Sequence, residues 1–253
     1  MLHRILWICV LAPMACTAFA PGLQALSSRA GGFDAPGLAS SGDRWEPYPG
    51  NPTSPPPLPA LGASWSTELS IELEEGEQIV TRAKRLVGVR SLARVSREVT
   101  DDCVGLVSLA YAPVGIRLMT DVAPGENGVS AIYREAKAAG ALHEWPPLPG
   151  DIVFFKETYD RNKDGRRNDG MTHVGVAESI DDQGTVTFLH RAQHGVVRAR
   201  FNPKYPLLRD DRLGEVLNDY LRPATSKQRG YLAGELFVAY ASPEALRAMA
   251  DFK

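Results

Sequence analysis

The sequence predicts an α+β domain, with helices first and an antiparallel sheet after them. Between residues 75 and 139, apolar side chains recur at the three- and four-residue spacing of helices. After Pro149 the spacing changes to two, and apolar runs rich in β-branched and aromatic residues are separated by turn residues. Helices and strands that are grouped in this way, instead of alternating, are typical of α+β folds.

The start of the chain has the pattern of an export signal. A short basic start precedes a mostly apolar run at residues 5–16, and Ala18-Phe19-Ala20 forms a small-x-small cleavage pattern. The run is shorter than the roughly 20 residues that span a bilayer, so no transmembrane segment is expected after signal removal. Residues 1–20 are therefore predicted to be a signal peptide, which implies export to the periplasm, the cell envelope or the medium. Alternatively, Cys16 becomes the acylated first residue of a lipoprotein.

Residues 21–66 are rich in proline, glycine, serine and alanine and are predicted to be a linker. Such a segment has little apolar surface to set against an ordering cost of about 1–2 kcal/mol per residue. Residues 67–253 then form the domain that carries the candidate site. The formal net charge is −2, which indicates neither a nucleic-acid partner nor a polybasic membrane contact.

Three helices are expected in the first half of this domain. The first covers about residues 75–87, where the apolar side chains share one face. The second covers residues 102–112 and ends there because Pro113 cannot continue it. It is apolar nearly all round, which predicts a buried helix. The third covers about residues 129–139 and stops at Gly140.

The second half is expected to form an antiparallel sheet. Its strands are the β-branched and aromatic runs at residues 152–155, 174–180, 185–190, 196–201 and 236–241.

Cys103 is the only cysteine that remains beyond the signal peptide, because the other two are Cys9 and Cys16. It cannot form an internal disulfide, which makes it a candidate reactive thiol. At the start of a helix, backbone N–H groups and the helix dipole favour the thiolate. Asp101 or Asp102 is the expected N-cap, and its negative charge opposes thiolate formation. The alternative interpretation is a small buried apolar side chain.

His173 and His190 are predicted to lie on one face of the sheet. If Asp181 and Asp182 form a two-residue hairpin turn, the histidines lie directly opposite each other. A four-residue turn at residues 181–184 shifts the pairing by two and keeps them on the same face, because side chains alternate along strands. Opposed residues have Cβ atoms about 4.5–5.5 Å apart, which allows two imidazole rings to interact.

In its order of motifs the chain resembles the NlpC/P60 family of papain-like cysteine peptidases, which cut bacterial cell-wall peptides. The resemblance covers about residues 78–201 and rests on four blocks followed by His190, namely residues 102–107 (DCVGLV), 115–118 (GIRL), 149–155 (PGDIVFF) and 173–176 (HVGV). It implies a papain-like fold, in which N-terminal helices carrying the cysteine pack on an antiparallel sheet carrying the histidines.

The resemblance also implies the roles of the site residues. Cys103 is the expected nucleophile, His173 the general base, and His190 the residue that fixes the tautomer of His173. The backbone N–H of Cys103 is the simplest oxyanion donor. His194, in an expected turn, is the reserve for the third role.

The expected activity is hydrolysis of peptide bonds in peptidoglycan stem peptides, and resemblance places the bond between D-glutamate and a diamino acid. Two positions depart from the family pattern: Val104 replaces the usual serine, and residues 88–94 replace a tyrosine and a glycine pair. One alternative is a CHAP-type amidase with Glu178 as third member, although Glu178 is an odd number of residues from His173 and should face the other way. The other is a catalytically silent wall-binding module of the same fold.

A polar segment before His173 resembles the start of a calcium loop. Asp160, Asn162 and Asp164 stand at its first, third and fifth positions, followed by a glycine. The twelfth position is Met171, where an EF-hand has a bidentate carboxylate. The sequence therefore leaves a structural Ca²⁺ and a solvated polar loop as alternatives, and no other cofactor is expected.

Overall fold

The computed structural model describes residues 63–119, 122–226 and 228–250, and the predicted signal peptide, Cys16 and most of the predicted linker lie outside them. The described part is an α+β unit built on an antiparallel sheet, as predicted. Its first three α-helices are α1 (Ala63–Arg85), α2 (Cys103–Tyr111) and α3 (Gly128–Ala138), and short 3₁₀ turns lie at Leu92–Arg94 and Ala112–Val114.

The main sheet has the strand order β1-β8-β2-β3-β4-β5. Its strands are β1 (Leu142–His143), β2 (Ile152–Lys156), β3 (Met171–Ile180), β4 (Val186–Ala192), β5 (Gly195–Phe201) and β8 (Phe237–Ala241). Strands β2 to β5 follow one another as a meander, and β8 pairs with the free side of β2. The remaining elements are β6 (Tyr220–Arg222), β7 (Tyr231–Leu232), α4 (Ala233–Leu236) and α5 (Pro243–Ala250).

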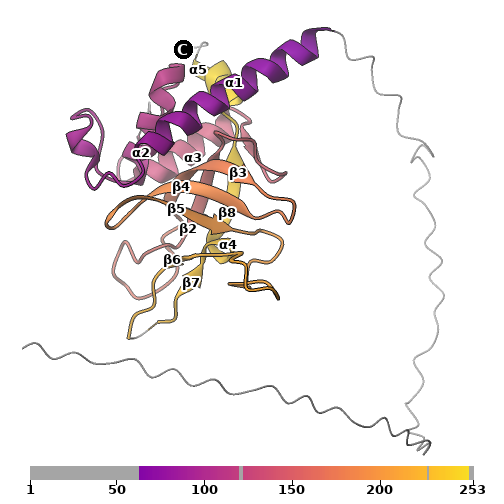
Figure 1. Ribbon diagram of the computed structural model, residues 1–253. Coiled ribbons are helices and arrows are strands. Elements are labelled where there is room, and N and C mark those ends of the chain that lie inside the picture. Colours follow the sequence, from indigo (N-terminus) through magenta and orange to yellow (C-terminus); the bar gives the residue numbers. More distant parts are fainter. Residues whose placement is uncertain (1–62, 120–121, 227, 251–253) are drawn as a thin grey trace, which may run out of the picture. The chain divides into compact units, whose positions relative to one another are not determined.

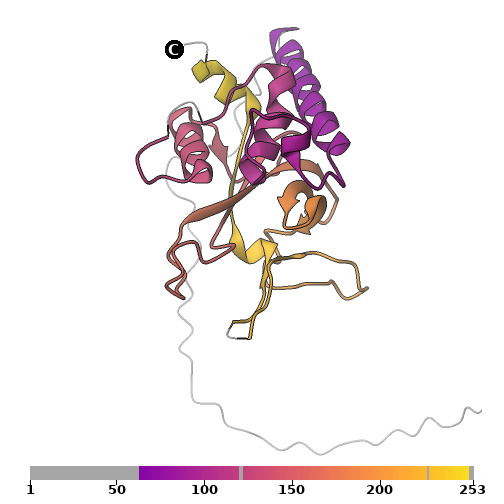
Figure 2. The same cartoon turned by 90° about the vertical axis from the view of Figure 1, so that its left-hand side faces the viewer.

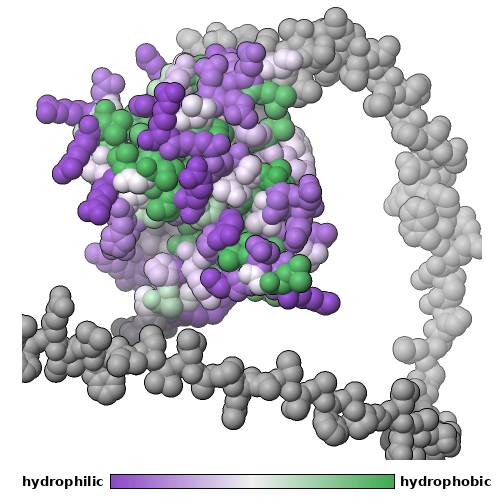
Figure 3. Space-filling view, viewed as in Figure 1, coloured by the Kyte–Doolittle hydropathy of each residue, from purple (hydrophilic) through white to green (hydrophobic). Residues whose placement is uncertain are grey.

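The two faces of the sheet pack into different cores. Helices α1, α2 and α3 cover one face, and the segment with β6, β7 and α4 lies on the other side (Figures 1 and 2). Phe154 and Val174 point to the helices, whereas Phe155 and Phe188 join an aromatic cluster on the opposite face. The outer surface seen in Figure 3 is largely hydrophilic, with separate hydrophobic patches. Because side chains alternate along each strand, the same strands contribute to the cores on both faces of the sheet.

Helix α2 is buried and capped as its sequence predicts. The carboxylate of Asp102 accepts the N–H of Gly105 at 2.9 Å, which identifies Asp102 as the N-cap. Gly105 also lets the backbone of α2 lie close to the Thr100 carbonyl, because a Cβ on Gly105 would be 1.8 Å from that oxygen. In α2 only Cys103 and Ser108 are not fully buried.

Some elements differ from the sequence prediction. Helix α1 begins at Ala63, so residues 63–66 are helical although they fall in the predicted linker. Strands β1, β6 and β7 are two or three residues long, which is too short to show a repeating pattern. The predicted strands of the main sheet are confirmed, with ends that differ by up to three residues.

We expect Gly105→Ala to lower the free energy of unfolding by about 1–3 kcal/mol, because the new Cβ has no room beside the Thr100 carbonyl. Urea denaturation measures this change. Ser108→Ala on the same helix is the matched control and should stay within about 0.5 kcal/mol of the wild type. Equal stability of the wild type and Gly105→Ala contradicts the expectation.

Candidate active site

Cys103 and His173 line the same cavity, which has a volume of about 420 Å³. Cys103 enters it from the first turn of α2, and His173 enters it from β3. Backbone N–H groups of Val174, Cys103 and Val104 donate toward the sulfur. Two of these donors belong to the helix start, where the sequence predicted an oxyanion site.

The thiol of Cys103 is less acidic than the sequence predicted. Burial raises its pKa and the charge of Asp102 raises it further, to about 11, although the backbone N–H groups lower it. The backbone N–H groups at the helix start favour the thiolate, as expected, but they do not outweigh burial and the charge of Asp102. Near neutral pH the thiol is therefore protonated, and a base must remove its proton during the reaction.

The two predicted histidines are hydrogen-bonded to each other. Nε2 of His173 and Nδ1 of His190 are 2.9 Å apart, and the ring centroids are 5.1 Å apart in an edge-to-face arrangement. Val176 pairs with Leu189, so near the histidines the register corresponds to the four-residue turn, beyond a bulge at Glu178. The prediction of a shared face is confirmed, and the histidines lie diagonally instead of directly opposite.

Gly175 makes room for this arrangement. A Cβ at this position would lie 2.8 Å from the carbonyl oxygen of Leu189 and 2.9 Å from the ring of Phe188. The same Cβ would be 3.4 Å from the Cβ of His190. A larger residue at Gly175 would therefore displace the strand segment that carries His190.

Both histidines are neutral at physiological pH. Burial lowers the pKa of His173 well below its ordinary value, and the neighbouring His190 lowers it further. Burial lowers the pKa of His190 to about 4, although Asp219 acts in the opposite direction. A single proton can then lie between Nε2 of His173 and Nδ1 of His190. If Nε2 carries this proton, Nδ1 of His173 is free to accept the proton of a thiol.

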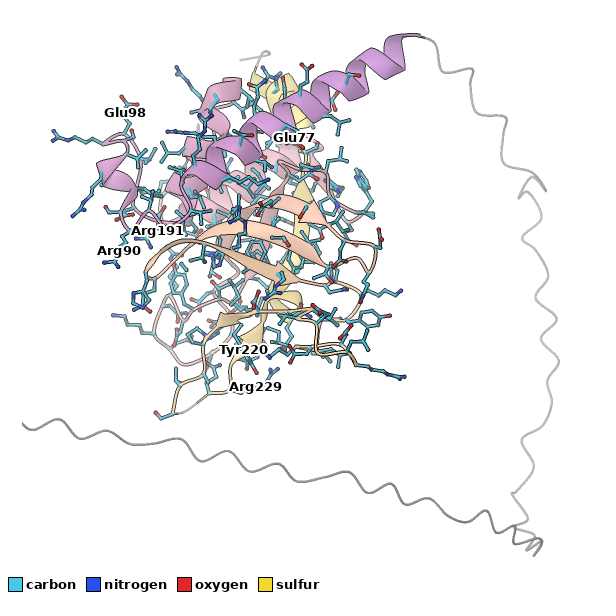
Figure 4. All side chains as sticks on the ribbon, in the orientation of Figure 1. Glu77, Arg90, Glu98, Arg191, Tyr220 and Arg229 are labelled. Atoms are coloured by element: carbon cyan, nitrogen blue, oxygen red, sulfur yellow. The ribbon has the colours of Figure 1, made fainter. Side chains whose placement is uncertain are left out.

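Three further residues of the cavity wall were not predicted. Arg191 pairs with Asp101 at 3.2 Å and donates to the carbonyl of Arg90 at 2.9 Å, and Figure 4 shows Arg90 beside Arg191. Tyr159 contributes its ring from the β2–β3 loop, and Asn127 caps α3 while donating to the start of β3. These residues meet only through long-range contacts, so local sequence patterns could not group them.

His194 and Glu178 are the two alternatives to His190 for the role of orienting His173. His194 is exposed in the turn between β4 and β5. Glu178 accepts from Arg198 at 2.6 Å and pairs with Lys84 of α1 at 3.3 Å. As its position in β3 predicted, Glu178 faces the helices, so it is not close to the histidine pair.

The predicted calcium ligands form a compact polar loop. Oδ2 of Asp160 accepts the N–H of Gly165 at 2.8 Å, and Oδ1 of Asn162 accepts the N–H of Asp164 at 3.0 Å. The second carboxylate oxygen of Asp164 accepts from the side chain of Asn168 at 2.8 Å. Within the described ranges, no three His, Cys, Asp or Glu side chains are grouped so that they could hold a metal.

Comparisons with family models, with curated proteins and with solved structures give no match to this chain. In the part of the chain that the structure describes, no helix is long and apolar enough to cross a membrane. The function of the protein is therefore inferred from the residues and geometry of the cavity.

We expect Asp102→Asn to accelerate alkylation of Cys103 by iodoacetamide at neutral pH by about three- to tenfold, because it removes a negative charge that raises the thiol pKa. Asparagine can still cap α2, so the helix start is retained. The rate of thiol modification is measured by mass spectrometry. Asp101→Asn is the matched control, and an unchanged rate in Asp102→Asn contradicts the electrostatic explanation.

We expect stability to fall as the pH decreases from about 6.5 to 4. The pKa of His190 is about 4 in the folded protein, below its ordinary 6.5, so the unfolded state binds the proton first. This single group accounts for a loss of about 3 kcal/mol across the window. Urea denaturation at a series of pH values should show a shallower loss for His190→Asn, and an identical loss would contradict the assignment.

Proposed function

We propose that this protein is a cysteine hydrolase that cleaves peptide or amide bonds in peptidoglycan stem peptides. The observation that carries the proposal is the joint placement of Cys103 and His173 on one cavity, with His190 hydrogen-bonded to His173. A thiol, a base and a residue that orients the base are the groups that nucleophilic catalysis by cysteine requires.

The reaction begins with transfer of the Cys103 proton to Nδ1 of His173. Sγ attacks the carbonyl carbon, and the oxyanion accepts hydrogen bonds from backbone N–H groups at the start of α2. Protonated His173 then gives its proton to the leaving amine, which separates and leaves a thioester on Cys103. Water attacks the thioester with His173 again acting as base, which releases the acid and restores the thiol.

His190 orients the base in this proposal. Its Nδ1 accepts the N–H of His173 Nε2, which leaves Nδ1 of His173 unprotonated. His190 is 6% exposed, so it supports His173 from the interior without contacting the substrate. Because it acts through another residue, its loss should cost less than the loss of His173.

The substrate class comes from the resemblance of residues 102–107, 149–155 and 173–176 to the NlpC/P60 peptidases. The cavity wall adds physical support, because it carries the cation of Arg191 and the carboxylates of Asp101 and Asp102. Charges of both signs suit a peptide that carries amino and carboxylate groups, as stem peptides with a diamino acid do. Export by the predicted signal would bring the enzyme to this substrate.

One observation favours a second candidate function. The raised pKa of Cys103 and the lowered pKa of His173 disfavour a preformed ion pair between thiolate and imidazolium. A wall-binding module with the same fold and no turnover would tolerate these values. The two functions differ in whether bonds are cleaved, so a product assay separates them.

We expect the full chain to release soluble peptides from purified peptidoglycan, and Cys103→Ala and Cys103→Ser to lower the rate more than about a thousandfold. His173→Ala should have a similar effect, while His190→Asn should retain more activity. Mass spectrometry of the released fragments measures the rate and identifies the bond that is cut.

His194→Ala is the matched control and should cleave at the wild-type rate, because this histidine lies in the exposed β4–β5 turn. Each variant must bind peptidoglycan and unfold at the wild-type temperature. Undiminished release by folded Cys103→Ala would exclude Cys103 as nucleophile. Binding to peptidoglycan without release by the wild type would favour the wall-binding module.

A further inference from the structure

Carboxylate oxygens without a partner are concentrated in the loop between β2 and β3. In the described part of the chain, the buried side-chain atoms without a hydrogen-bond partner are His143 Nδ1, Glu157 Oε2, Asp160 Oδ1 and Asp169 Oδ2. Three of these four atoms are carboxylate oxygens of residues 157–169. A buried carboxylate oxygen without a hydrogen-bond donor is costly, so three such oxygens in one loop point to a ligand that supplies positive charge.

Each of these carboxylates uses its other oxygen to hold the loop. Oδ2 of Asp160 accepts the N–H of Gly165 at 2.8 Å, and Oδ1 of Asp169 accepts the N–H of Asn162 at 3.1 Å. The loop backbone is thus closed by one oxygen of each aspartate. The second oxygen of each is buried and available to a ligand.

Glu157 provides evidence that is independent of the sequence motif, since it precedes the motif in the chain. It is 7% exposed, and its Oε1 accepts the N–H of Gly170 at 2.8 Å. This bond fixes the carboxylate against the end of the loop beside Asp169. Its Oε2 is buried and has no hydrogen-bond partner.

The basic residues of the loop do not pair with these free carboxylate oxygens. Arg161 donates to the carbonyl of Gly125 at 3.3 Å, in the segment before α3. The guanidinium of Arg167 lies 4.4 Å from the centroid of the Tyr231 ring. Lys163 and Arg166 are exposed. None of the ion pairs of the described residues involves Glu157, Asp160 or Asp169. The buried Arg222 donates to the backbone carbonyl of Glu157 at 2.8 Å, not to its carboxylate.

We propose that this loop binds a Ca²⁺ ion through the free oxygens of Asp160 and Asp169, with Glu157 adding negative charge from the buried side. The remaining ligands are amide and carbonyl oxygens of the loop, such as the side chain of Asn162. Ca²⁺ accepts such neutral oxygens, whereas zinc prefers nitrogen and sulfur. Such neutral oxygens are needed here, because no three acidic, histidine or cysteine side chains of the described ranges are grouped so that they could hold a metal.

The ion would act on the candidate active site through the chain on both sides of the loop. Tyr159 directly precedes Asp160 and lines the catalytic cavity. At the other end the loop continues into β3, where Thr172 and His173 line the same cavity. Calcium would therefore fix two parts of the cavity wall. This regulatory role rests on the proposed hydrolase function, but the binding of the ion does not.

The test measures binding in the full chain with Cys103→Ala, which separates it from catalysis. We expect Tb³⁺ to give luminescence when tyrosine is excited, because Tyr159 adjoins Asp160, and Ca²⁺ to compete at millimolar concentration or below. Ca²⁺ should also raise the melting temperature by several degrees. Asp160→Asn and Asp169→Asn should each weaken binding at least about tenfold.

Asp182→Asn is the matched control, because Asp182 is an exposed aspartate in the β3–β4 turn, and it should bind as the parent does. The proposal is overturned if about 10 mM Ca²⁺ changes neither luminescence nor melting temperature. It is also overturned if folded Asp160→Asn, verified by circular dichroism, keeps the parental affinity.

Activity assays of the wild type then test regulation. If the chain releases stem peptides, chelation of Ca²⁺ should slow release and Asp182→Asn should respond like the wild type. Equal release with and without Ca²⁺ overturns the regulatory role. If the chain binds Ca²⁺ but releases no peptide, the proposed hydrolase function is wrong and the proposed cation site is still supported.

Discussion

The burial of helix α2 between α1 and the sheet is the constraint on which the candidate site depends. A helix that is apolar nearly all round must be covered on every side, and α2 leaves only Cys103 and Ser108 partly accessible. Its first N–H groups need a cap, which Asp102 provides. Close packing at Gly105 then fixes the direction from which the sulfur enters the cavity.

This arrangement creates opposing electrostatic effects at one atom. The helix start supplies N–H groups that stabilise negative charge on sulfur, while burial and the cap carboxylate of Asp102 oppose it. The opposing effects are larger, so the thiol is neutral. His173 is neutral for the same reason, because its ring is also removed from water. Packing thus keeps Cys103 and His173 in their neutral forms, between which a proton can be transferred, and disfavours the ionised forms.

The sequence predicted those elements that are specified by residues close together in the chain. Pro113 marks the end of α2, and the period of two after Pro149 marks the strands of the main sheet. The shared face of His173 and His190 followed from alternation along strands, a rule that tolerated either turn length. The direction of the Cys103 pKa shift was missed because it depends on burial. Arg191 was missed because its partner is 90 positions away in the chain.

The neutral state of Cys103 affects how readily the sulfur is oxidised. Oxidants attack the thiolate far more readily than the thiol, and cysteine that reaches the sulfinic or sulfonic state is usually lost irreversibly. A pKa of about 11 keeps nearly all of the sulfur in its unreactive form at neutral pH. Export would carry the protein into an oxidising compartment, where no second cysteine beyond the predicted signal peptide could form an internal disulfide. The low acidity of this thiol therefore protects it from oxidation, and in the proposed hydrolase a base would make the sulfur nucleophilic only during the reaction.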